Sequence, residues 1–128
     1  MMTSLDTNVV LRFLLDDIPE QTIKASKLIQ KTKVYVTDVV VVEAIYVLER
    51  VMQLSRQDIT KLVADFLGFA NVVHNPYFLL DAIRFYRQHP SLSIVDCYAA
   101  IEAKAYGNQL ATFDKRLIRE GGTHVNGL

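Results

Sequence analysis

The chain has 128 residues, 51% of them hydrophobic, and its 14 Lys and Arg residues balance its 14 Asp and Glu residues. This length and apolar content predict one compact domain, residues 1–128, with a sizeable core. The balanced charge excludes a strongly basic nucleic-acid footprint and an acidic tail, and it neither favours nor excludes a nucleic acid as substrate.

Two features set expectations about the compartment. Cys97 is the single cysteine and cannot form an intramolecular disulfide, and the N-terminal MMTSLDTN lacks the basic and apolar regions of a secretory signal. The longest apolar stretch, VVVVEAIYVL at residues 39–48, is shorter than the ~20 residues that span a bilayer. We therefore expect a cytoplasmic protein without a membrane segment.

The first elements alternate between strand and helix. Residues 2–5 predict a strand, and the apolar spacing of residues 7–17 predicts a helix. Pro19 is suited to the first turn of a second helix, which we place over residues 20–33. VYVT at residues 34–37 predicts a second strand.

Residues 38–53, DVVVVEAIYVLERVMQ, are ambiguous. Four consecutive valines favour a strand, whereas the length of the segment and its Ala, Leu, Glu and Arg residues favour a helix. We interpret the segment as a helix with Asp38 as its N-cap.

The remaining elements have clear start and stop residues. Ser55 caps a helix over residues 56–70, with Asp58 completing a pattern like a capping box and Gly68 near the end. In order, the later elements are a strand at 72–74, a helix at 77–89 opened by Pro76 and closed by Pro90, a helix at 94–106 begun by Ser93 and ended by Gly107 and Asn108, a strand at 109–112, a short basic helix at 114–120 and a fifth strand at 123–125.

Strands that are separated by helices predict an α/β fold. Right-handed crossovers would join them into a central parallel sheet of about five strands with helices on both faces.

Four carboxylates are expected at one edge of that sheet. Asp6 follows the first strand, Glu43 lies in the second turn of the helix after the second strand, and Asp114 follows the fourth strand. The helix that begins near Asp96 runs back to the start of the fourth strand, so Asp96 returns to the same end as Asp114. The carboxyl edge of an open α/β sheet is the usual place for a ligand.

Four neighbouring carboxylates need a compensating positive charge. Oxygen ligands favour Mg²⁺ or Mn²⁺, and His74, His89 and His124 lack the spacing of a zinc site. Such an ion suits metal-assisted hydrolysis of a phosphodiester. The expected substrate-binding cations on the rim of the site are Arg12, Lys115, Arg116 and Arg119.

The motifs together resemble a known family. LDTNVVLRFLLDD, the Glu of VVVVEAIYVL, the Asp of LSIVDCYAA and the TFD of LATFDKRL look like a PIN domain, specifically the small VapC-type toxins of prokaryotic toxin–antitoxin pairs. The resemblance covers essentially the whole chain, and the order and spacing of the motifs make it specific.

The resemblance implies a PIN-like three-layer α/β/α fold and a Mg²⁺- or Mn²⁺-dependent endoribonuclease. It implies that the metal ligands and catalytic residues are Asp6, Glu43, Asp96 and Asp114. Asn8 and Thr112 would support them by hydrogen bonds that orient the ligands. A homodimer and inhibition by a cognate antitoxin protein are also implied.

Each acid has a purely structural alternative. Asp6 suits the N-cap of the first helix, Asp96 completes a capping box with Ser93, and Asp114 suits the start of the last helix. Glu43 could belong to a solvated stripe with Arg50 and Gln53 on the same helix. Outside the acids, Cys97 is predicted to be a small buried residue, and the aromatic residues Phe66, Phe69, Phe85 and Tyr86 are predicted to be core or dimer contacts.

Three other functions stay open. A haloacid-dehalogenase-class phosphatase would use Asp6 as nucleophile, although Asn8 stands where its second acid belongs. A non-catalytic PIN-like module would bind RNA or protein without cutting. A DNA nuclease is the third alternative, because nothing obvious here reads the 2′-hydroxyl of RNA.

Overall fold

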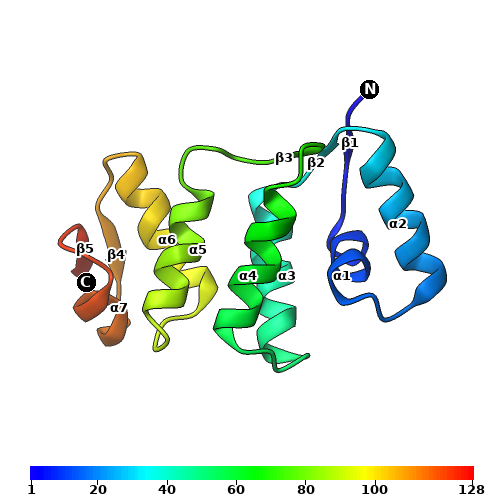
Figure 1. Cartoon of the computed structure of the whole chain (residues 1–128). Coiled ribbons are helices and arrows are strands. Elements are labelled where there is room, and N and C mark those ends of the chain that lie inside the picture. Colours follow the sequence, from blue (N-terminus) through cyan, green and yellow to red (C-terminus); the bar gives the residue numbers. More distant parts are fainter. The chain divides into compact units, whose positions relative to one another are not determined.

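The structure, a computed structural model that describes residues 1–128, contains two compact units, Met1–Asn75 and Pro76–Leu128. Each unit has its own helices and its own parallel sheet (Figure 1). That residues 1–128 form a single domain stays a prediction.

The first unit contains three strands and four helices. They are β1 (Thr3–Ser4), α1 (Thr7–Leu15), α2 (Pro19–Lys31), β2 (Val34–Tyr35), α3 (Asp38–Arg50), α4 (Arg56–Leu67) and β3 (Val72–Val73). The strands form a parallel sheet in the order β1-β2-β3, with Thr3 opposite Val34 and Val34 opposite Val72. The carboxyl ends of these strands therefore share one edge, and the chain enters α1 and α3 directly from it.

The ambiguous segment is a helix, as predicted. In α3 the buried residues are Val41, Ala44, Ile45 and Leu48, which recur at the spacing of one helical face. Glu43 lies off that face and is exposed. The valines therefore contribute to packing of the helix and do not form a strand.

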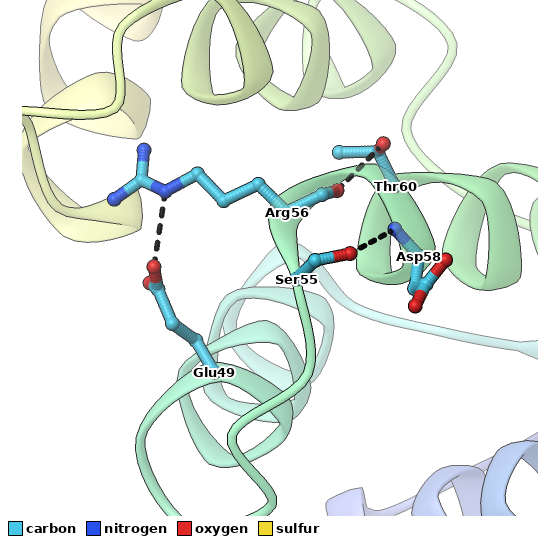
Figure 2. A network of polar contacts seen from close by, with 5 residues as sticks. All are labelled: Glu49, Ser55, Arg56, Asp58 and Thr60. Carbon is cyan, nitrogen blue, oxygen red and sulfur yellow. Dashed lines mark hydrogen bonds and ion pairs between the residues drawn. The ribbon is translucent and has the colours of Figure 1, made fainter.

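The junction between α3 and α4 is held by a polar network (Figure 2). The Ser55 hydroxyl caps α4 by accepting from Asp58 N at 3.1 Å, as predicted, and the Thr60 hydroxyl donates to the Arg56 carbonyl at 2.8 Å. Arg56 Nε lies 3.0 Å from Glu49 Oε2, and the two side chains are only 16% and 26% exposed. Because water is partly excluded from this pair, it ties α4 to α3 more firmly than a surface pair would.

The predicted N-cap of α3 was wrong by one residue. Thr37 has the extended backbone of a cap, and its hydroxyl accepts from Val40 N at 3.2 Å. Asp38 is already helical, and its carboxylate accepts from the Asn75 side-chain amide at 2.8 Å. The hydroxyl satisfies the helix end, which leaves the carboxylate of Asp38 for a contact with the chain after β3.

The second unit contains α5 (Leu79–Gln88), α6 (Ile94–Ala105), β4 (Leu110–Thr112), α7 (Lys115–Glu120) and β5 (Val125–Gly127). Helix α6 ends as predicted, since Gly107 adopts a φ of 72° and its N–H bonds to the Lys104 carbonyl. Asn108 N bonds to the Ala103 carbonyl at 2.8 Å. These two bonds form a Schellman motif, which turns the chain sharply from α6 into β4.

Pro76 does not open α5, contrary to the prediction. Residues 76–78 form a turn, and the helix begins at Leu79. The backbone of Phe78 is not helical, and its side chain is 4% exposed, with its ring 5.6 Å from that of Tyr98 and 5.7 Å from that of Tyr106. Packing of this aromatic ring in the core determines where the helix starts.

The α/β class and the parallel direction of the strands are confirmed: the first unit has the three-stranded sheet described above, and the second unit has a two-stranded one. Within the second unit, strands β4 and β5 pair with each other, with Leu110 opposite Val125. The fifth strand also lies two residues later than predicted. None of the helices has both the length and the apolar character needed to cross a membrane.

Two further predictions concern buried side chains. Cys97 is fully buried, as predicted for a small core residue. Phe66 and Tyr86 are exposed by only 1% and 0%, which confirms them as core residues. Phe69 is 46% exposed, and its ring contacts those of Phe13 and Phe66.

Candidate functional site

Asp6 and Glu43 both belong to the first unit, and a hydrogen bond links Glu43 to the residue after Asp6. Asp6 is the N-cap of α1, and its Oδ1 accepts from Val9 N at 3.0 Å. The next residue, Thr7, donates its hydroxyl hydrogen bond to Glu43 Oε1 on α3. Glu43 is therefore bonded to the residue that follows Asp6, at the edge where β1 and β2 end.

The partner of Glu43 was not foreseen from the sequence. Neither Arg50 nor Gln53 contacts it, and Thr7 on another helix provides its hydrogen bond. The available signal was the hydroxyl that stands between Asp6 and Asn8 in DTN. Asn8 itself is exposed and makes no hydrogen bond with either carboxylate, so its supporting role stays a prediction.

Asp96 makes only half of the capping box. The Ser93 hydroxyl accepts from Asp96 N at 3.1 Å, so Ser93 is the N-cap of α6. No hydrogen bond runs back from the Asp96 carboxylate to Ser93 N. The half-buried carboxylate is therefore not used by the cap.

Asp114 is the N-cap of α7, and both its carboxylate and its backbone N–H form hydrogen bonds. Its Oδ1 accepts from Arg116 N at 2.8 Å and from Leu117 N at 3.1 Å. Its own N–H donates to the Thr112 hydroxyl at 3.0 Å, which fixes the turn between β4 and α7. Its second carboxylate oxygen accepts no hydrogen bond.

Within the second unit, Asp96 and Asp114 lie toward the same end of neighbouring elements. Helix α6 and strand β4 contact each other and run in opposite directions around the turn at Gly107 (Figure 1). Asp96 is near the start of α6 and Asp114 follows the end of β4, as the connectivity predicts.

The four predicted acids are divided between the units: Asp6 and Glu43 belong to the first, and Asp96 and Asp114 to the second. Within either unit, no three side chains of His, Cys, Asp or Glu are grouped so that they could hold a metal ion. Their convergence therefore stays a prediction.

The predicted substrate-binding cations differ in whether a carboxylate pairs with them. Arg12 lies on α1 with its Nε 3.4 Å from Asp17 Oδ1, and its side chain is 21% exposed. Lys115, Arg116 and Arg119 on α7 are exposed and form no ion pair. The α7 cations are therefore available to an incoming anion, whereas Arg12 is partly neutralised.

A cavity of about 360 Å³ adjoins Asp6 in the first unit. It lies between α1 and α2, and its lining residues are Asp6, Asn8, Val9, Arg12, Gln21, Lys24, Ala25 and Leu28. Asp6, Asn8 and Arg12 were predicted from the sequence as site residues. Gln21 and Lys24 were not, because polar residues on the exposed face of an amphipathic helix such as α2 form no recognisable motif.

The donor atoms fit a hard divalent cation. Asp6, Glu43 and Asp114 each commit one carboxylate oxygen to a hydrogen bond within the protein and leave the other without one. Carboxylates with an unused oxygen are suitable ligands for Mg²⁺ or Mn²⁺.

Comparison with known proteins identifies the family. The PIN domain family matches residues 4–121. A VapC ribonuclease of Aquifex aeolicus (strain VF5) is 32% identical to the chain over 132 aligned positions, which cover 98% of this chain and 96% of that protein. No solved structure gives a significant match. The chain belongs to the PIN domain family.

Proposed function

We propose that this chain is a metal-dependent endoribonuclease and the toxin of a type II toxin–antitoxin pair. The observation that supports the chemistry is the hydrogen bond from Thr7, the residue after Asp6, to the Glu43 carboxylate. The similarity of almost the whole chain to a protein named VapC ribonuclease supports RNA as the substrate.

The proposed metal site uses all four predicted acids. Asp6, Glu43, Asp96 and Asp114 hold Mg²⁺ or Mn²⁺, which requires the units to be the two halves of one PIN domain, residues 1–128. The family match supports this, because residues 4–121 cross the boundary after Asn75.

A divalent ion held there would supply positive charge to the phosphodiester and acidify a water molecule. The chain's own residues fix the ligands beforehand. The Val9 amide orients Asp6, the Thr7 hydroxyl orients Glu43, and the first amides of α7 orient Asp114. Such outer contacts limit the motion of each carboxylate and raise the affinity of the site.

Supporting and substrate-binding roles extend the proposal. Thr112 fixes the backbone of Asp114. Asn8, two residues after Asp6 in the first turn of α1, supports Asp6. The cations that bind RNA phosphates are Arg12, Lys115, Arg116 and Arg119. The lack of ion pairs at the three α7 cations supports this role, because no protein acid competes with phosphate for them.

We extend the proposal to partners and compartment. The toxin acts in the cytoplasm as a homodimer and is inhibited by a cognate antitoxin protein. The name of the Aquifex relative supports the toxin–antitoxin assignment.

The test is cleavage of RNA by the purified protein with Mg²⁺ or Mn²⁺. Wild type should cut, EDTA should abolish cutting, and Asp6→Asn should reduce the rate by more than the ~10- to 100-fold typical of lost outer contacts. Asp65→Asn is the matched control, because Asp65 is 66% exposed on α4 and paired with Lys61. Equal cleavage by wild type and Asp6→Asn would contradict the proposal.

Two further measurements distinguish the ribonuclease from the alternative functions. RNA binding without cleavage in any metal would favour the non-catalytic module. A DNA strand of the same sequence, assayed in parallel, distinguishes a ribonuclease from a DNA nuclease.

A further inference from the structure

The cavity between α1 and α2 has a polar, charged side next to Asp6. Its volume of about 360 Å³ lies at the lower end of the ~300–1,000 Å³ usual for small-ligand pockets. Asp6 lines it, as do Gln21 and Lys24 from one turn of α2. A group bound in this cavity would therefore lie beside the proposed metal site.

Two cations line this cavity, and only one of them is free. Arg12 Nε is shielded from solvent, makes no hydrogen bond and lies 3.4 Å from Asp17, so its charge is partly balanced. Lys24 is exposed and forms no ion pair. An anion that enters the cavity would thus meet one unpaired ammonium group.

The apolar floor of the cavity suits a sugar or base as well as an anion. Val9, Ala25 and Leu28 line it together with the amide side chains of Asn8 and Gln21. A phosphate alone gains nothing from apolar walls, whereas a nucleotide unit presents a phosphate, hydrogen-bonding groups and a flat apolar face.

We propose that the α1–α2 cavity is a subsite for the RNA nucleotide adjoining the cleaved bond, with Lys24 binding its phosphate and Gln21 donating a hydrogen bond to it. This inference rests on the proposed ribonuclease function and adds two residues to it. Lys24 and Gln21 act on substrate binding, and the metal ligands act on the chemical step.

The experiment measures kcat and KM for a single-stranded RNA oligonucleotide at several salt concentrations. Lys24→Ala should raise KM about fivefold with kcat nearly unchanged, since one partly exposed charge-assisted hydrogen bond is lost. The slope of log(kcat/KM) against log[salt] should become shallower by about 0.7, the value for one phosphate contact on a single strand. Lys24→Arg should retain most of the affinity.

Lys27→Ala is the matched control, because Lys27 is exposed on the same helix and does not line the cavity. It should leave KM and the salt slope close to wild type. If wild type cuts RNA and the Lys24 and Lys27 variants behave alike, the subsite is refuted and the ribonuclease stands. A fall in kcat and in melting temperature without a change in KM would show a structural role for Lys24 and also refute the subsite. If wild type cuts no RNA, both the ribonuclease and the subsite are wrong.

Discussion

Replacing Thr7 by Val tests whether the hydroxyl holds Glu43 for metal binding. Valine has nearly the shape of threonine and a similar helix propensity, so α1 should form as before. The substitution removes the donor to Glu43 Oε1 and leaves the carboxylate without a fixed orientation.

The magnitude follows from the surroundings of the bond. A hydrogen bond to a charged acceptor contributes about 1.5–3 kcal/mol when buried. Thr7 is half-buried and Glu43 is exposed, so water can replace part of the bond, and about 1 kcal/mol is a realistic loss. This corresponds to about a fivefold higher Mg²⁺ or Mn²⁺ concentration for half-maximal RNA cleavage.

The assay is a metal titration of RNA cleavage, accompanied by urea unfolding without metal. Thr7→Ser keeps the hydroxyl and should titrate like wild type, whereas Thr7→Val should need more metal at unchanged stability. A Thr7→Val curve that superimposes on wild type would refute the positioning role. If Glu43→Gln also leaves metal affinity unchanged, Glu43 belongs to a solvated face and is not a ligand.

Two further predictions concern stability. A single PIN domain should unfold in urea in one transition with coincident far-ultraviolet circular dichroism and tyrosine fluorescence, and two separate transitions would contradict it. Gly121→Ala should lower the free energy of unfolding by about 1–3 kcal/mol, because its Cβ would lie 2.6 Å from the Leu117 carbonyl and 2.8 Å from Val125 Cγ2. Gly68→Ala, whose Cβ would make ordinary contacts at 3.4 Å, is the control and should change stability by less than about 0.5 kcal/mol.

Helix positions were predictable where local signals agreed. Ser55 and Ser93 each precede a helix and accept from the amide three residues on, as the sequence pattern indicates. Residues 39–48 were correctly predicted as helical despite four valines, because the length of the segment and the spacing of its buried side chains outweigh β-propensity.

Long-range contacts caused the misses. Thr37 and Asp38 are both good caps, and the sequence alone does not show that Asp38 is committed to Asn75. The start of α5 depends on the rings that receive Phe78, and those belong to α6 and the residue after it. Capping and helix starts of this kind are decided by tertiary packing, which local patterns do not contain.

The direction of the strands was predictable, whereas the partner of each short strand was not. Helices between all the strands require parallel pairing, and every observed pair is parallel. Each strand has only two or three residues, so few backbone hydrogen bonds specify its neighbour. Pattern alone therefore could not show that β4 and β5 pair with each other.

The structural and functional interpretations of the acids do not exclude each other. Asp6 and Asp114 each cap a helix with Oδ1, as the structural alternative predicts, yet Oδ2 of each remains without a hydrogen bond. Because asparagine caps helices about as well as aspartate, Asp6→Asn should keep the stability of α1 while removing the charge that a metal needs. Asp6→Ala should lose both, at a cost of about 1 kcal/mol in unfolding free energy. If Asp6→Asn retains activity while Asp6→Ala is less stable, Asp6 is only a cap. If Asp6→Asn is as stable as wild type but inactive, and Asp6→Ala is both inactive and less stable, the capping carboxylate is also a metal ligand.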